Sequence, residues 1–478
     1  MESKPIRSLL VANRGEIARR VIRTARRLSI RTVALHSDVD AKALHVKEAD
    51  AAVPLGGNAP GETYLDIEKV VAAAKKAGAE AIHPGYGFLS ERPTFARRCR
   101  EESILFVGPS PEAMEALGDK ERAREVARRV GAPLAPGTPI LPGPDEAARE
   151  AERVGYPVLL KASAGGGGIG TKRVDSPADI AKAFDEASRR AQQAFGDGRL
   201  YLEKYLRDPH HIEVQVLGDR AGKVVTFVER ECSVQRRFQK VIEESPSPFA
   251  TPALRQRLRE AARAVAKVAK YENAGTVEFV VDGDRNPYFL EVNTRLQVEH
   301  PVTEMVTEIV RGAQPKASTA GRTAAEGGRK SNRLDLVEQQ LRIAAGELLA
   351  LDEARLPVSG HAIQCRVYAE DPERFFPSPG PLATYREPSG EGVRVDSGYT
   401  QGDALTPHYD PLIAKLIVHG PDRETAISRM AGALERYEIG GLKHNIPFLK
   451  NAVGSDLFRG GNYTTHFIEA LRAAAMRK

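Results

Sequence analysis

Residues 291–301 read EVNTRLQVEHP, and this stretch decides the interpretation of the whole chain. Its first residues end an apolar segment, Pro287–Asn293, that predicts a strand. Because residues two apart in a strand face the same side, Glu291 and Asn293 project together. The loop that follows brings an arginine, an amide, a carboxylate and an imidazole together within a few residues. A loop this polar directly after a strand is more typical of a site than of a scaffold.

A second predicted strand, residues 275–281, carries Glu278. Pairing between the two strands would bring Glu278 opposite Glu291, with Asn293 beside them. Two carboxylates and an amide oxygen are hard ligands that suit a magnesium ion carrying ATP phosphates. A solvated sheet face with two glutamates is the alternative interpretation.

The loop after Asn293 favours the metal. Arg295 can fork onto an oxyanion, Gln297 can orient that anion, and Glu299 can act as a base. The stretch therefore predicts a metal half followed by an anion half.

A glycine run follows another predicted strand, residues 156–162. Glycine leaves the backbone free, so successive N–H groups can wrap around a phosphate. The run lacks the lysine and hydroxyl residue of a P-loop, and a flexible linker is the alternative. Lys161 at the strand end favours phosphate. The glycines are Gly165, Gly166, Gly167 and Gly168.

The order of strands and helices predicts about three domains in the 478 residues. Residues 1–117 alternate strands and helices, which predicts an α/β unit with a Rossmann-like parallel sheet. Residues 118–310 carry more strands and predict an antiparallel α+β nucleotide-binding unit. Residues 311–333 read as a flexible basic insertion, 334–450 as a mixed α/β unit, and 451–478 as a helical tail. The predicted strands are 8–12, 31–36, 81–83, 104–107, 156–162, 212–217, 224–230, 275–281, 287–293, 361–369 and one within 408–418; the longer helices are 13–28, 65–77, 252–271 and 422–434.

Composition excludes several classes of protein. The net charge is +6, and residues 311–333 alone hold six basic residues against Glu326, so a nucleic-acid-binding face is not indicated. No apolar run approaches the length of a membrane span, and the apolar run near the N-terminus, residues 9–12, is short. The cysteines Cys99, Cys232 and Cys365 are widely spaced. We therefore expect a cytoplasmic chain with no membrane partner, no disulfide framework and no zinc site.

Long strings in the sequence resemble the biotin carboxylases, a branch of the ATP-grasp enzymes. They run from LLVANRGEIA through HPGYGFLSE, ERECSVQRR, LEVNTRLQVEHPVTEM and GHAIQCRVYAEDP to HYDPLIAKLI. The resemblance implies an N-terminal Rossmann-like domain, a central ATP-grasp domain with a mobile glycine-rich lid at about residues 133–206, and a C-terminal mixed α/β domain.

The resemblance also implies roles for individual residues. Magnesium or manganese would be held by Glu278, Glu291 and Asn293. Bicarbonate would be gripped by Lys240, Arg295, Gln297 and the Val298 backbone, with Glu299 taking its proton. Arg366 would steady the biotin enolate, with Tyr86 nearby. The residues implied for ATP are Lys120, Lys161, Gly165, Gly166, Gly167, Gly168, Glu203, Lys204, Leu206, His211 and Gln235.

The implied reaction makes carboxyphosphate from ATP and bicarbonate and then carboxylates biotin. None of the five methionines lies in the Met-Lys-Met that presents biotin, so we expect biotin on a separate carrier protein. A carboxyltransferase subunit would handle the acceptor, an acyl-CoA or pyruvate. The resemblance further implies a homodimer.

Four features depart from the family pattern. Ile169 replaces a basic residue, which Lys172 could supply only with a change of register, and Phe238 replaces a histidine that contacts ribose. Gln364 stands where glutamate is common, and the insertion at 311–333 replaces a short turn. These departures predict weaker ATP binding with intact chemistry. The alternatives are an ATP-grasp ligase with another acceptor and a catalytically silent assembly subunit.

Overall fold

The computed structural model describes residues 4–163, 170–309 and 333–476. Gly165, Gly166, Gly167, Gly168 and Ile169 lie outside the described residues, as does most of the predicted insertion at 311–333. Within the described ranges, no helix has the length and apolar character that crossing a bilayer requires.

The N-terminal region folds around a five-stranded sheet with the order β3-β2-β1-β4-β5. Every strand pair is parallel, which confirms the predicted Rossmann-like sheet. β1 is wholly buried, as expected for a strand covered by helices on both faces. The strands are β1 (Ser8–Val11), β2 (Arg31–His36), β3 (Ala51–Pro54), β4 (Ala81–His83) and β5 (Leu105–Phe106); the helices are α1 (Gly15–Arg27), α2 (Leu44–Glu48), α3 (Ile67–Ala77), α4 (Pro93–Glu101) and α5 (Pro111–Gly118).

The central region is built on a nine-stranded antiparallel sheet. Its order is β14-β13-β9-β11-β12-β15-β20-β18, with β10 paired to β9. α9 (Pro252–Val268) packs against β9, and their apolar residues share one core with β13 and β14. The strands are β9 (His210–Gly218), β10 (Val224–Thr226), β11 (Arg230–Arg236), β12 (Gln239–Ser245), β13 (Asn273–Val281), β14 (Pro287–Asn293), β15 (His361–Tyr368), β18 (Val393–Ser397) and β20 (Leu412–Gly420); α6 (Lys120–Arg129), α10 (His300–Val306) and α11 (Leu336–Ala344) adjoin them.

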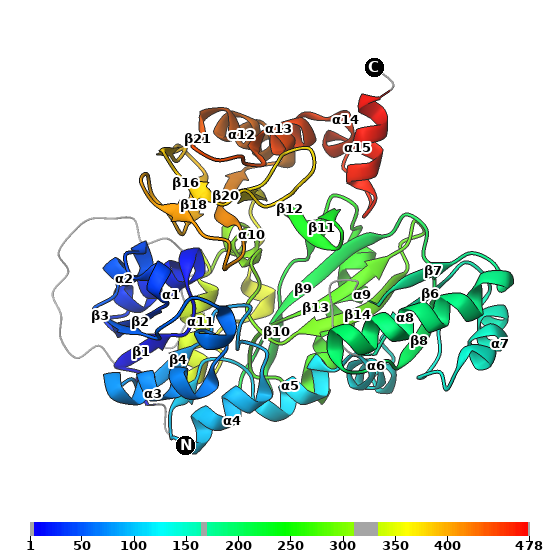
Figure 1. Cartoon of the computed structure of the whole chain (residues 1–478), viewed down its shortest axis with the longest axis horizontal. Helices are drawn as coiled ribbons and strands as arrows, with labels where there is room; N and C mark the ends of the chain where they lie inside the picture. The colour runs from blue at the N-terminus through cyan, green and yellow to red at the C-terminus, as the bar shows by residue number, and fades with distance from the viewer. Residues whose placement is uncertain (1–3, 164–169, 310–332, 477–478) are drawn as a thin grey trace.

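A smaller three-stranded sheet, β7-β6-β8, stands apart with its own core. Its strands are β6 (Val158–Ala162), β7 (Lys172–Val174) and β8 (Leu200–Lys204), packed against α7 (Pro144–Val154) and α8 (Ile180–Phe195). Figure 1 shows this unit at the right-hand end of the molecule, beside the large sheet. We call it the lid sheet.

The C-terminal region extends the large sheet, because β12 pairs with β15. The central and C-terminal regions therefore share one sheet. Helices pack against this part of the sheet, where α12 (Arg423–Arg436) contacts β15 and β20, and Figure 1 places them at the top with the C-terminus. These are α12, α13 (Ile446–Gly454), α14 (Asp456–Arg459) and α15 (Phe467–Ala475); short ladders join β16 (Gly380–Pro381) to β19 (Ala404–Leu405) and β17 (Thr384–Arg386) to β21 (Glu438–Gly440).

The structure corrects some predicted elements. The strand predicted at 224–230 is two elements, because β10 ends at Thr226 and β11 begins at Arg230. The strands β3, β7, β8, β12 and β18 were not predicted, nor were the short strands β16, β17, β19 and β21. These strands are short or lie in polar sequence, so apolar periodicity alone does not reveal them.

Candidate active site

A cavity of about 520 Å³ lies between the large sheet and the lid sheet. Every predicted site residue in the described part of the chain lines it, apart from Tyr86. These are Lys120, Lys161, Glu203, Lys204, Leu206, His211, Gln235, Lys240, Glu278, Glu291, Asn293, Arg295, Gln297, Val298, Glu299 and Arg366.

The alternation of side chains along each strand explains why polar residues gather here. In β9, Ile212, Val214 and Val216 enter the apolar core, so His211 and Glu213 point to the other face. β13 and β14 pair with Glu278 directly opposite Glu291. The predicted pairing of these two strands is therefore confirmed.

Lys240 is surrounded by carboxylates. Its Nζ donates to Glu213 Oε2 at 2.5 Å, to Glu278 Oε1 at 2.7 Å and to Glu299 Oε1 at 2.7 Å. Burial alone would lower the pKa of Lys240, but these three carboxylates raise it well above its ordinary value. Lys240 therefore stays charged and holds the strands and the loop together.

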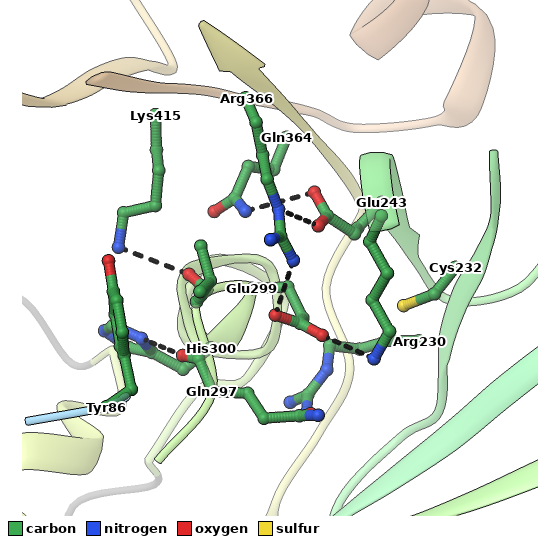
Figure 2. A network of polar contacts seen from close by, with 12 residues as sticks. Tyr86, Arg230, Cys232, Glu243, Gln297, Glu299, His300, Gln364, Arg366 and Lys415 are labelled. Carbon is green, nitrogen blue, oxygen red and sulfur yellow. Dashed lines mark hydrogen bonds and ion pairs between the residues drawn. The ribbon is translucent and has the colours of Figure 1, made fainter. Parts of the chain in front are cut away.

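Glu299 lies between two cations. Lys240 donates to one carboxylate oxygen, and Arg366 Nη2 donates to the other, Oε2, at 3.0 Å; Figure 2 shows the contact with Arg366. Burial would raise the pKa of Glu299, but Lys240, Arg366 and Arg230 lower it below its ordinary range. The carboxylate is ionised, as a base must be, and its basicity depends on how tightly the cations hold it.

Glu278 and Glu291 face one another with incomplete compensation. Burial and the charge of Glu278 raise the pKa of Glu291, although Lys120 Nζ lies 3.7 Å from Glu291 Oε2 and lowers it. Asn293 Nδ2 donates to Glu278 Oε1 at 2.8 Å. Two facing carboxylates with an amide beside them fit a hard cation. Another acidic cluster, formed by His211, Glu213 and Glu278, already has the Lys240 ammonium against two of its carboxylates.

The lysines predicted for phosphate binding rest on carboxylates of the cavity wall. Lys161 Nζ lies 2.5 Å from Glu203 Oε2, and Arg124 pairs with the other oxygen of Glu203. Burial would lower the pKa of Lys161, but Glu203 and Tyr201 raise it to about 12. Both lysines, Lys120 and Lys161, therefore present positive charge to the cavity.

The end of β8 joins the lid sheet to the large sheet. Lys204 donates its backbone N–H to the carbonyl of Pro136, and its Nζ donates to the carbonyl of Gly155 at 2.6 Å. The Lys204 side chain thus ties the end of β8 to the chain at Gly155, just before β6 of the lid sheet. The remaining predicted nucleotide residues lie further along the wall: His211 Nε2 is 3.1 Å from Glu278 Oε2, and Gln235 donates to the carbonyl of Cys232.

Residues 295–299, predicted to bind an anion and called the anion loop below, are held by contacts on several sides. Arg295 Nε donates to Glu91 Oε2 at 2.9 Å, and Gln297 Nε2 donates to Glu278 Oε1 at 2.7 Å. Lys415 Nζ donates to the carbonyl of Val298 at 3.2 Å. Lys415 and Arg366 are partners on the paired strands β20 and β15, and Figure 2 shows both side chains reaching toward this loop from the same side.

Comparisons with known proteins match this geometry to one family. Family models for the biotin carboxylase N-terminal domain, the carbamoyl-phosphate synthase L chain ATP-binding domain and the biotin carboxylase C-terminal domain match residues 5–114, 119–312 and 364–470. A biotin carboxylase from Halalkalibacterium halodurans is 48% identical over 97% of each chain. The chain belongs to the biotin carboxylase family. It is therefore an ATP-grasp ligase that carboxylates biotin with ATP and bicarbonate.

Solved biotin carboxylase structures superpose on nearly the whole chain. A complex of the Campylobacter jejuni biotin carboxylase named for β,γ-ATP has a TM-score of 0.90 at 42% identity, covering 97% of this chain and 99% of that one. The biotin carboxylase domain dimer of Hydrogenobacter thermophilus 2-oxoglutarate carboxylase, named as bound to MgADP, ADP and bicarbonate, has a TM-score of 0.89 at 46% identity, covering 98% of both chains. The fold of this chain is thus that of a biotin carboxylase.

Tyr86 is the described site residue that does not line the cavity. Its hydroxyl donates to Glu16, and Lys415 Nζ lies 5.9 Å from its ring centre and 2.9 Å from Glu16 Oε2. The loop that carries Tyr86 is fixed because the Asn13 side chain donates to the carbonyls of Pro84 and Tyr86. Tyr86 thus lies behind the anion loop of the biotin carboxylase site.

Two departures from the biotin carboxylase pattern have structural consequences. Phe238 is 65% exposed at the β11–β12 turn and lines the cavity, where its ring offers no hydrogen bond to a sugar hydroxyl. Lys172 pairs with Glu186 of α8 at 2.8 Å. Its charge is therefore already engaged within the lid sheet.

Some residues that contact the predicted site residues were missed in the sequence. Arg230, fully buried, pairs with Glu213 and donates to Gln297 Oε1 at 2.8 Å. Glu243 accepts from Arg366. The alternation of His211, Glu213 and Gln215 with apolar residues was a usable signal for Glu213. No local pattern distinguishes Arg230 or Glu243 from surface residues.

Proposed function

We propose that the chain carboxylates biotin presented by a separate carrier protein, as the first half-reaction of an acyl-CoA or pyruvate carboxylase. The observation that carries this proposal is the Glu299 carboxylate held between Lys240 and Arg366 in the cavity, with Arg295 in the same cavity wall. Such a cluster combines cations for a small anion with a base for its proton.

Bicarbonate would bind to Lys240, Arg295, Gln297 and the Val298 backbone. In the ligand-free arrangement Lys240 rests on Glu299. When bicarbonate binds to Lys240, the ion pair between Lys240 and Glu299 weakens. The pKa of Glu299 then rises, so its carboxylate becomes a better base for the proton of bicarbonate. Glu299 then takes the proton of bicarbonate.

ATP would lie along the lid. Lys120 and Lys161 would hold its phosphates, and Glu203, Lys204, Leu206, His211 and Gln235 would surround the nucleoside. Glu278, Glu291 and Asn293 would hold magnesium or manganese, which neutralises phosphate charge. Gly165, Gly166, Gly167 and Gly168 are proposed as the phosphate cover on the resemblance alone.

The chemistry is then positioning and charge neutralisation. A bicarbonate oxygen attacks the γ-phosphorus and the bond to ADP breaks, giving carboxyphosphate. Carboxyphosphate releases carbon dioxide and phosphate, and the phosphate takes the proton of the biotin ureido nitrogen. The nitrogen attacks carbon dioxide, while Arg366 steadies the enolate and Tyr86 lies in a loop nearby.

The proposed partners are a second copy of the chain, a biotin carrier protein and a carboxyltransferase subunit. Relatives named as subunits support separate partners: the small subunit of Hydrogenobacter thermophilus 2-oxoglutarate carboxylase is 46% identical over 97% of this chain and 93% of its own length. The proposed units are 1–117, 118–310 and 334–450, with a basic insertion at 311–333 and a helical tail at 451–478. The matched ranges 5–114, 119–312 and 364–470 support the three units, whereas the last match continues through most of the proposed tail. Three free, buried cysteines support a cytoplasmic location.

ADP release in the presence of magnesium tests the proposal. We expect bicarbonate-dependent ADP release that free biotin accelerates. ADP release with bicarbonate but without any response to biotin would indicate a ligase with another acceptor. No turnover by folded protein would indicate a silent assembly subunit.

A further inference from the structure

Gln364 is fully buried in β15 and lies opposite Glu243 of β12. Its side-chain Nε2 donates to Glu243 Oε2 at 3.1 Å. Arg366, two residues along the same strand and on the same face, donates from Nε to Glu243 Oε1 at 2.6 Å. Figure 2 shows both bonds converging on Glu243. One carboxylate is thus shared by a neutral amide and a guanidinium.

Glu243 sets the direction in which Arg366 points. With Nε held by Glu243, Nη2 of Arg366 reaches Glu299 Oε2 at 3.0 Å. Glu243 and Gln364 are both fully buried, so water cannot replace either partner. Gln364 Oε1 has no hydrogen-bond partner among the described residues, so the bond to Glu243 decides how the amide is turned. The flipped amide would set an oxygen against a carboxylate.

The charges that face this pair come from three elements. Lys240 of β12 and Arg366 of β15 are cations, and Glu299, just before α10, is an anion. α10 begins with His300, whose pKa burial holds well below its ordinary value. On the other sides stand the Cys232 thiol of β11, uncharged because burial raises its pKa, and the apolar Ile417 of β20. The Tyr368 hydroxyl of β15 also faces the group, and burial raises its pKa.

Burial raises the pKa of Glu243, Arg366 lowers it, and the Glu299 charge raises it again. A donor at Oε2 that cannot titrate therefore favours the charged form of Glu243. A glutamate at position 364 would instead place two buried carboxylates together, and such a pair shares one proton.

We propose that Gln364 is a positioning residue whose amide keeps the Glu243 carboxylate turned toward Arg366, so that the guanidinium presented to biotin stays fixed across the neutral pH range. The proposal rests on the proposed contact between Arg366 and biotin. It extends the site to a residue that contacts no substrate.

Two variants separate positioning from simple packing. In Gln364→Glu, the new carboxyl can donate to Glu243 as the amide does while the two carboxylates share a proton. Once that proton leaves at higher pH, this variant loses the donor. We expect its kcat/KM for free biotin, relative to wild type, to fall about tenfold from about pH 6.5 to about pH 8.5. Methionine in Gln364→Met has neither a donor nor a charge. The kcat/KM of this variant for free biotin, relative to wild type, should therefore be low at every pH and should not fall as pH rises.

Cys365→Ala is the matched control, because Cys365 is the neighbouring residue and faces the apolar core. Its ratio to wild type should be independent of pH. A second readout needs no catalysis: the melting temperature of ligand-free Gln364→Glu should fall relative to wild type as pH rises, since a raised carboxyl pKa costs stability in that direction.

Parallel pH profiles for Gln364→Glu and Gln364→Met would overturn the proposal. A wild type without biotin-dependent turnover would instead defeat the proposed function. The melting comparison would then still decide whether the two carboxylates share a proton, and a flat difference would overturn the positioning role as well.

Discussion

Arg230→Met should destabilise the chain strongly, although Arg230 does not line the cavity. The guanidinium is fully buried, pairs with Glu213, and donates to Gln215, Thr303, Thr276 and Gln297. Removing one partner of a buried ion pair costs about 3–5 kcal/mol, because the other charge stays buried. Lys240 still contacts Glu213 at 2.5 Å, so we expect a loss near the middle of that range, about 4 kcal/mol.

Urea denaturation followed by circular dichroism measures this loss as a shift in the midpoint of the transition that includes the large sheet. Arg230→Lys is the matched variant: it keeps the charge but not the forked donors, so its loss should be smaller. Arg7→Met is the control, since the pair between Arg7 and Glu80 is exposed, and its midpoint should barely change. A loss below about 1 kcal/mol for Arg230→Met would refute the reasoning that Arg230 carries the buried network.

Three further results are expected. Phe238→His should lower the KM for ATP about fivefold with kcat unchanged, because one hydrogen bond to the ribose is worth about 1 kcal/mol; an unchanged KM would show that the exposed ring is not at the ribose. Glu16→Gln should remove a pH dependence of stability. Burial raises the Glu16 pKa to about 7, so the free energy of unfolding of the wild type falls by up to about 3 kcal/mol as pH rises from about 4.5 to about 7. Thermal melts across that pH range should show this fall for the wild type and not for the variant. Lys161→Met should weaken ATP binding, measured by calorimetry, while Lys172→Met should not, since Glu186 already engages Lys172; equal losses would place both lysines on the nucleotide.

Much of the fold was predictable because its strands carry local signals. The parallel N-terminal sheet follows from short apolar strands, such as β1, separated by helices. The pairing of β13 with β14 was also predictable, since the two are neighbours in the sequence. The pairing of β12 with β15 was not, because no local pattern links segments so far apart. One sheet therefore runs through two regions that the sequence separates.

The candidate site was predictable in its side chains and less so in their partners. Glu299, Arg295 and Gln297 were identified from a crowded polar loop. What holds them in place was not, because Arg230 and Glu243 resemble surface residues in sequence and gain meaning from burial alone. The position of Tyr86 behind the loop likewise depends on Glu16 and Lys415, which come from distant elements.

Transfer of labelled carbon from bicarbonate to free biotin tests the central claim most directly. Wild type with ATP and magnesium should form labelled carboxybiotin. Glu299→Gln, which keeps the size of the side chain but removes the base, should lower the rate about 10²–10⁴-fold while still binding ATP. Labelled biotin formed equally fast by Glu299→Gln, or no labelled biotin from wild type, would contradict the account.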